Sequence, residues 1–103
     1  MMAGLTVVSE SLSRETHLRT GRPIRHKSWV ILLDDEFYYV SWLSVSPSGD
    51  RPECAAFLSD ECGRVLDWEE LACCSCTDPR MALTQIVDQL RNDGDDYRSR
   101  ECA

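Results

Sequence analysis

The densest apolar pattern of the chain lies between residues 28 and 45. Two runs, 28–33 and 37–45, are rich in Trp, Val, Ile, Tyr and Phe, the residue types that favour strands. The charged triplet Asp34-Asp35-Glu36 separates these runs. The pattern therefore predicts a β-hairpin with a three-residue connection.

Shorter strand-like segments follow this hairpin. The Ser/Pro/Gly-rich residues 46–52 predict a loop, and residues 53–59 predict a third strand. Residues 60–63 predict a turn and 64–68 a fourth strand, after which a brief turn leads into an edge strand over 71–76. The order of these elements predicts an antiparallel, mainly meandering sheet of four or five strands.

Helical periodicity appears near the C-terminus. Thr77 or Asp78 is a predicted N-cap, Pro79 suits the first turn, and Gly94 suits the position after the last turn. Apolar residues at helical spacing form one stripe that we expect to pack on the sheet: Ala82, Leu83, Ile86, Val87 and Leu90. Residues 93–103 have almost no apolar content and predict a flexible tail.

The N-terminal residues 1–23 form a basic segment whose structure the sequence leaves open. Residues 5–20 fit both a helical stripe and an extended strand. Gly21-Arg22-Pro23 then predicts a turn that opens a single core over residues 24–92. The predicted fold class is α+β, with the C-terminal helix packed on one face of the sheet.

Both faces of the predicted hairpin are apolar. If Leu33 lies opposite Phe37, one face holds Trp29, Ile31, Leu33, Phe37, Tyr39 and Leu43, and the other holds Val30, Leu32, Tyr38, Val40 and Trp42. A single helix covers only one face, so the second needs cover from residues 5–20, a second copy or a partner. Where a partner covers it, we expect Tyr38 and Trp42 to be apolar anchors.

Charge divides the 103-residue chain unevenly. Residues 1–30 hold five Lys or Arg and two Glu, whereas residues 31–103 hold six Arg and sixteen Asp or Glu. An acidic body disfavours direct binding of nucleic acid or of an anionic membrane, and it favours a partner protein with a basic surface. At this length, with 43% hydrophobic residues, we expect one domain with a modest core, for which a homodimer would add stability.

Part of the negative charge is predicted to gather at one end of the sheet, in two acidic turns. In an up-and-down sheet, the triplet 34–36 and the pair 60–61 lie at the same end, which gathers Asp34, Asp35, Glu36, Asp60 and Glu61. Neighbouring strands are about 4.8 Å apart, so such carboxylates match the spacing of a phosphate backbone. The hypothesis is mimicry of nucleic acid in a basic groove; the alternative is that these turns serve solubility and block edge pairing.

Six cysteines offer a metal-binding alternative. Cys73 and Cys76 have the spacing of two zinc ligands, and either Cys54 and Cys62 or His17 and His26 would complete a set of four. The competing interpretation is that these cysteines are small buried residues. No export signal or apolar run of about 18 residues is visible, so we expect reduced thiols, a cytoplasmic protein and no cofactor.

Candidate catalytic groups are few. Nucleophilic catalysis needs a Cys or Ser beside an oriented histidine, and the chain has only His17 and His26, both within the net-positive residues 1–30. Carboxylates are abundant, but acid–base work needs them in a sheltered cleft. We therefore expect a protein that is not an enzyme.

One stretch carries a resemblance to a known group of proteins. Its residues follow the pattern E-x3-F-x2-D-x2-G-x-V-x-D-W-x-E-L, over 53–71. This pattern resembles small uncharacterised proteins of phages and other mobile elements. The resemblance implies a mobile-element context and, from it, an inhibitor of a host defence system that handles nucleic acid, such as a CRISPR effector or a restriction enzyme. The alternative function is a small zinc-stabilised or homodimeric interaction module.

Overall fold

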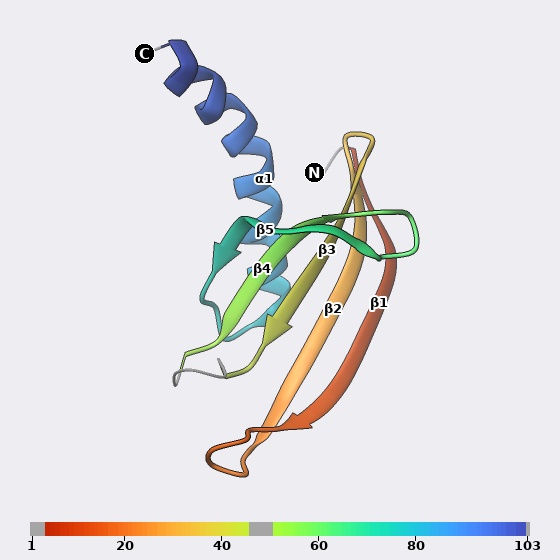
Figure 1. Cartoon of the computed structure of the whole chain (residues 1–103), viewed down its shortest axis with the longest axis vertical. Coiled ribbons are helices and arrows are strands. Elements are labelled where there is room, and N and C mark those ends of the chain that lie inside the picture. Colours follow the sequence, from red (N-terminus) through yellow and green to blue (C-terminus); the bar gives the residue numbers. More distant parts are fainter. Residues whose placement is uncertain (1–3, 46–50, 103) are drawn as a thin grey trace.

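Five strands form one antiparallel sheet in which sequence neighbours are also neighbours in space (Figure 1). The computed structural model describes residues 4–45 and 51–102, with side chains as far as Asn92. The elements are β1 Leu5–Thr16, β2 Pro23–Leu33, β3 Glu36–Leu43, β4 Glu53–Ser59, β5 Val65–Cys74 and α1 Pro79–Cys102. The predicted α+β fold, a meander sheet with one C-terminal helix packed against it, is confirmed.

The turn between β2 and β3 is one residue shorter than predicted. Leu33 pairs with Glu36, so only Asp34 and Asp35 connect the strands. Their φ angles are 49° and 71°, the left-handed values that a two-residue hairpin turn of type I′ requires. Asp tolerates this region better than most residues. The predicted three-residue connection is wrong, because Glu36 belongs to β3 and not to the turn.

This shift of one residue moves every side chain of β3 to the opposite face. Trp29, Ile31 and Leu33 of β2 therefore share a face with Tyr38, Val40 and Trp42 of β3, and not with Phe37, Tyr39 and Leu43. The predicted grouping of the faces is corrected accordingly, although both faces still carry apolar residues.

Helix α1 covers one face of the sheet, which we call the covered face. Asp78 is the N-cap: its carboxylate accepts a hydrogen bond from the Arg80 N–H at 3.0 Å, and its carbonyl accepts one from Ala82 at 2.9 Å. The predicted stripe faces the sheet, with three residues buried and two partly buried: Ala82, Ile86, Val87, Leu83 and Leu90. The helix continues to Cys102, so its predicted end at Gly94 is wrong.

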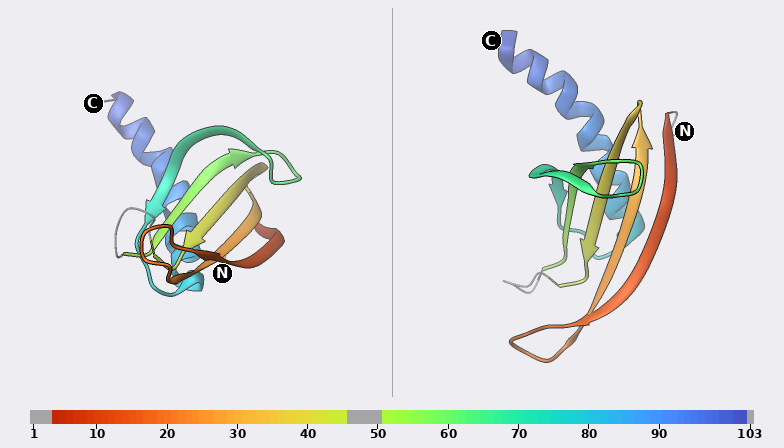
Figure 2. Two further views of the ribbon diagram at one scale, coloured as in Figure 1. Left: turned by 60° about the horizontal axis from the view of Figure 1, so that its bottom comes forward. Right: turned by 45° about the vertical axis from the view of Figure 1, so that its right-hand side comes forward.

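Strand β5 is one irregular strand where a fourth strand, a turn and a fifth strand were predicted. Ala56 pairs with Ala72 and Leu58 with Asp67, so Phe57 on β4 lies opposite the four residues 68–71. Such a bulge increases local twist and bends the strand. Figure 2 shows the result, because β5 arches away from the direction of the other strands.

The N-terminal segment supplies β1, an edge strand that pairs with β2 along its whole length. A bulge at Val8 interrupts this ladder once. All residues from 6 to 16 are exposed, so β1 lies beside β2 and covers neither face of the sheet.

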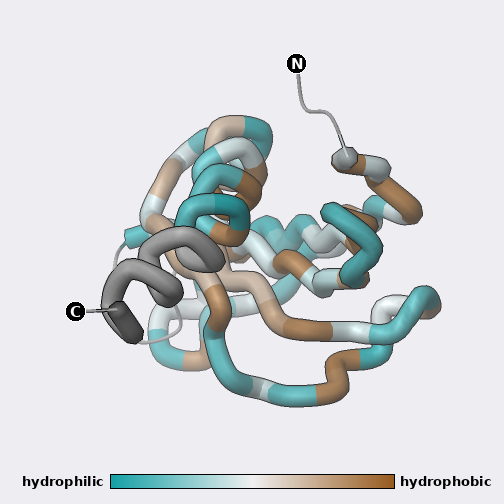
Figure 3. Tube along the Cα trace, turned by 90° about the horizontal axis from the view of Figure 1, so that it is seen from above, coloured by the Kyte–Doolittle hydropathy of each residue, from teal (hydrophilic) through white to brown (hydrophobic). Residues whose placement is uncertain are grey.

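The face opposite α1, which we call the open face, has partial cover from the chain itself. The β4–β5 turn folds back over β2, where Gly63 lies against Val30. Gly63 has φ +87°, which favours glycine, and a Cβ at this position would meet the Val30 side chain. Backbone conformation and lack of space therefore both require glycine here. In the tube coloured by hydropathy, short apolar stretches alternate with polar ones along both the sheet and the helix (Figure 3).

Candidate functional site

The open face holds a hollow of about 350 Å³ over strands β2 to β5. Side chains from four strands line it, and together they define the open-face hollow: His26, Tyr39, Ser41, Leu43, Glu53, Ala55, Phe57, Trp68 and Glu70. These residues alternate with those of the covered face along β3 and β4. The hollow is not covered by α1, because α1 packs on the other face.

An aromatic pair forms one wall of this hollow. The rings of Phe57 and Trp68 meet edge to face, with centroids 5.2 Å apart and planes at 61°. The bulge of β5 brings Trp68 opposite Phe57, and Trp68 is 72% exposed. Most of this large aromatic side chain is open to solvent and accessible to a ligand.

Two carboxylates stand at the border of the hollow. Glu53 and Glu70 also line a neighbouring hollow of about 430 Å³, together with Arg51, Pro52 and residues 73–75. Both glutamates are exposed, and the same bulge presents the exposed Asp67 and Glu69. The site therefore combines an aromatic wall with concentrated negative charge, which is the chemistry that attracts an organic cation.

The structure also brings together a histidine, a serine and a glutamate on three neighbouring strands. Nε2 of His26 lies 2.9 Å from Oγ of Ser41, and its Nδ1 lies 3.4 Å from Oε1 of Glu15. A carboxylate only accepts, so Nδ1 donates toward Glu15, and the neutral ring with its proton on Nδ1 accepts from the Ser41 hydroxyl at Nε2. This is the order of nucleophile, base and orienting acid, and the sequence interpretation missed it.

The backbone of β3 does not offer this arrangement the donors that acyl transfer needs. Ser41 lies on β3, which has β2 on one side and β4 on the other, so the ladder takes up the backbone N–H groups of β3. An oxyanion hole needs donors that point at the developing charge. We interpret the three residues as a polar link that fastens β1 and β2 to β3.

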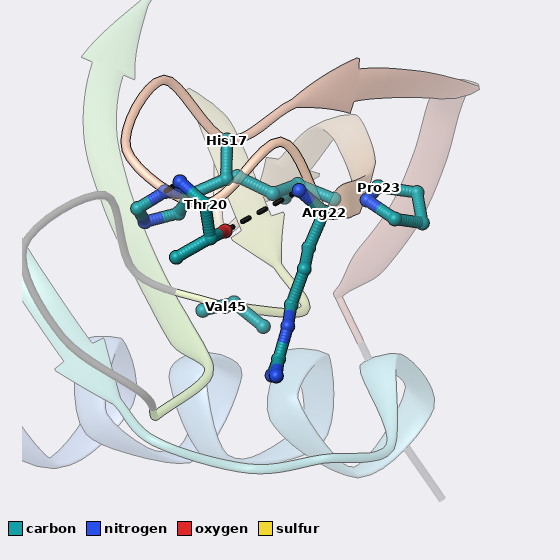
Figure 4. Close-up of a pocket in the computed structure, with 6 residues that line it drawn as sticks. His17, Thr20, Arg22, Pro23 and Val45 are labelled. Carbon is teal, nitrogen blue, oxygen red and sulfur yellow. Dashed lines mark hydrogen bonds between the residues drawn. The ribbon is translucent and has the colours of Figure 1, made fainter.

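His17 organises the β1–β2 turn. Its Nδ1 accepts hydrogen bonds from the N–H groups of Arg19 at 3.2 Å and Thr20 at 3.3 Å. A pocket of about 170 Å³ beside it is lined by Thr20, Arg22, Pro23, Ile24 and Val45 (Figure 4). These hydrogen bonds to turn N–H groups give His17 a structural role in the β1–β2 turn.

The two predicted apolar anchors belong to the covered face. Trp42 is 1% exposed and its indole N–H donates to the Cys76 carbonyl at 2.8 Å, so its assignment as a partner-binding anchor is wrong. Tyr38 is partly buried against the same core. Burial raises the pKa of its hydroxyl, and the charges of Glu36 and Asp34 raise it further. The one-residue shift in β3 is the physical reason for both placements.

The five predicted turn carboxylates are divided between two places. Asp34, Asp35 and Glu36 extend from the tip of the β2–β3 hairpin, whereas the β4–β5 turn lies lower, across the open face (Figure 1). Asp60 uses its Oδ1 inside its own turn, where the N–H groups of Cys62 and Arg64 donate to it at 2.9 Å. Glu61 is exposed.

The predicted cysteine set is likewise split. Cys54 is buried at the start of β4 beside Cys74, its partner in the ladder, while the exposed Cys62 lies in the turn beyond the other end of β4. Burial raises the pKa of the Cys54 thiol, and neighbouring Cys74 raises it further. Among the residues that the structure describes, no three His, Cys, Asp or Glu side chains are grouped to hold a metal ion.

The sequence predicted that several residues of the hollow lie in strands, but it did not predict that they lie together. Tyr39, Phe57 and Trp68 read as strand residues, and the register that unites them depends on the length of one turn and on the bulge of β5. Their spacing along the chain gave no signal of their proximity.

Comparison of the chain with protein families, curated proteins and solved structures finds no match. Within residues 4–45 and 51–102, no helix has the length and apolar character to span a membrane.

Proposed function

We propose that this protein is a non-enzymatic binding protein for a basic surface of another protein, and that the open-face hollow receives an arginine or lysine side chain of that partner. The observation that carries the proposal is the pairing of Phe57 and Trp68 with Glu53 and Glu70 around one hollow. An aromatic face attracts a cation, and a carboxylate at the rim gives it a charged hydrogen-bond partner.

Charge elsewhere on the molecule supports the same class of partner. The net charge is −7, so a basic protein is attracted before contact, and the attraction weakens as salt is added. Asp34, Asp35 and Glu36 at the β2–β3 tip add to this steering at a distance from the hollow.

A narrower form of the proposal concerns the target. A basic surface on a nucleic-acid-handling protein is a surface that normally holds phosphates, so an acidic protein seated there competes with nucleic acid and inhibits. The resemblance of residues 53–71 to proteins of phages and mobile elements favours a host defence protein, such as a CRISPR effector or restriction enzyme, as that target. Inhibition relieved by added duplex DNA is the expected behaviour.

Calorimetric titration with an arginine-containing peptide tests the proposed site. The variant Glu53→Gln/Glu70→Gln removes two carboxylates from the hollow, and we expect it to weaken binding by roughly tenfold or more, since charged hydrogen bonds are lost. A matched peptide with citrulline in place of arginine has the same shape without the charge, and we expect it to bind weakly to every variant.

The variant Asp34→Asn/Asp35→Asn is the control. It changes the net charge from −7 to −5, as the first variant does, and Asn tolerates the left-handed conformation of both positions. We expect its affinity to stay within about twofold of the parent. An equal loss for the two variants would mean that general electrostatics binds the peptide, and the hollow would lose its assigned role.

A further inference from the structure

The two edge strands of the sheet end in different ways. At β5, the bulge over residues 68–71 breaks the regular ladder, and Gln89 of α1 covers the strand at Cys73. Oε1 of Gln89 accepts from the Cys73 N–H at 3.0 Å, and Nε2 donates to its carbonyl at 2.7 Å. A bulge and an occupied backbone both prevent another strand from pairing there.

Strand β1 has a bulge only at Val8, near its start, and the rest of its outer edge has neither protection. It is 12 residues long and all residues from 6 to 16 are exposed, including Val7, Val8 and Leu12. In the described part of the chain, no side chain hydrogen bonds to its backbone between residues 5 and 16. A long exposed edge strand with apolar side chains is a template for pairing with another strand. After the bulge at Val8, residues 9–16 form a regular segment.

The charges of this segment are self-complementary in one register. In an antiparallel pair of identical strands with the two-fold axis at Leu12, Glu10 lies opposite Arg14 of the second copy, and the same pair recurs across the axis. A two-fold axis at Glu10 would place like charges together, and one at Ser13 would place Leu12 opposite a guanidinium. An axis at Ser11 would place Val8, the bulge residue, opposite Arg14.

Contacts within one copy leave the required groups available. Trp29 Nε1 and Lys27 Nζ both approach Oε2 of Glu10, at 3.1 and 3.8 Å, so Oε1 remains for a guanidinium. Within the described residues Arg14 has no ion pair of its own. Leu12 is 66% exposed, and packing on its symmetry mate would bury it.

We propose that β1 pairs antiparallel with β1 of a second copy about a two-fold axis at Leu12, which joins the two sheets into one of ten strands. The axis is perpendicular to the joined sheet, so both helices lie on one side and both open-face hollows face the other. The dimer presents two equivalent hollows to a partner, although its formation does not depend on the function proposed for them.

Sedimentation of the full chain over a range of concentrations tests this proposal, and we expect a reversible dimer. Leu12→Lys places two positive charges at the axis and should give a monomer. Leu66→Lys makes the same change at a 61% exposed leucine of β5 and should leave the dimer intact. Circular dichroism confirms that each variant is folded.

The register has its own test. Arg14→Glu turns two attractive pairs into two repulsive ones and should raise the dimer dissociation constant by roughly tenfold to a hundredfold. Glu10→Arg/Arg14→Glu exchanges the charges and should restore dimerisation; if that double variant does not fold, the single variant alone decides. A parent chain that remains monomeric up to its solubility limit, or a dimer indifferent to Arg14→Glu, would overturn the proposal.

Discussion

The two faces of the sheet use alternate residues of the same strands for different purposes. On the covered face, small residues such as Cys54, Ala56 and Ala72 lie near Ala82, and they let α1 approach the sheet closely. On the open face, aromatic residues and carboxylates surround a hollow, and Trp68 remains mostly exposed. One face therefore holds the fold together, while the other leaves its aromatic and acidic side chains accessible to solvent.

Substitution of two tryptophans on opposite faces should give the largest difference in stability between the faces. Trp42 is buried and hydrogen-bonded to Cys76, so Trp42→Ala should lower the free energy of unfolding by about 3–5 kcal/mol. Trp68→Ala loses mainly the contact with Phe57 and should cost about 1 kcal/mol or less. Urea unfolding of both variants provides the measurement, and equal losses would show that the open face also belongs to the core.

The next effect concerns the turn that partly closes the open face. A Cβ at Gly63 would lie 2.5 Å from Cγ2 of Val30, at φ +87°, so Gly63→Ala should cost about 2–4 kcal/mol from strain and overpacking. Gly21 has φ +70° but no atom within 4 Å of such a Cβ. Gly21→Ala should therefore cost only about 1 kcal/mol.

Thermal unfolding of these two glycine variants separates crowding from backbone strain. If Gly63→Ala lowers the free energy of unfolding no more than Gly21→Ala does, the β4–β5 turn does not pack on Val30. The open face would then include Val30.

Alkaline pH should lower the free energy of unfolding by less than the substitutions above, through groups on the covered face. Burial is the main cause that raises the pKa of Cys54, Cys74 and Tyr38. Above the ordinary thiol pKa of about 8.5 the unfolded chain loses protons that the folded chain keeps. The stabilisation is thus complete below that pH and declines as the pH rises toward the elevated pKa values, by about 1 kcal/mol or more near pH 10.

Urea unfolding at pH 7 and pH 10 measures this decline. Cys54→Ala removes the most strongly affected thiol, so its stability should change less between the two pH values. A variant with the same pH dependence as the parent would assign the decline to other groups.

Local patterns in the sequence were sufficient for the meander order of β2 to β4 and for the start of the helix, whereas β1 was left open and β5 was predicted as two strands. The strand runs, the Asp78-Pro79 start and the apolar stripe of α1 each follow from short-range rules, and each is present in the structure. The assignment of faces was wrong because it depended on whether Glu36 belonged to the turn or the strand. A single residue there decides which side chains meet α1.

The candidate site was less accessible from the sequence. The proximity of Phe57 and Trp68 follows from a four-residue bulge in β5. The contact between His26 and Ser41 joins the neighbouring strands β2 and β3. Both result from tertiary pairing that no local pattern encodes. Trp42 and Trp68 belong to the same residue type, and only their register separates a core residue from a binding candidate.

The most direct test of the binding face uses the three indole N–H resonances in an NMR titration with an arginine-containing peptide. Trp29 donates to Glu10 and Trp42 donates to Cys76, whereas the Trp68 indole has no hydrogen bond within the described residues. We expect the Trp68 resonance to shift until the peptide saturates the site, while the Trp29 and Trp42 resonances stay in place. A Trp68 resonance that does not move while the peptide binds elsewhere would contradict it.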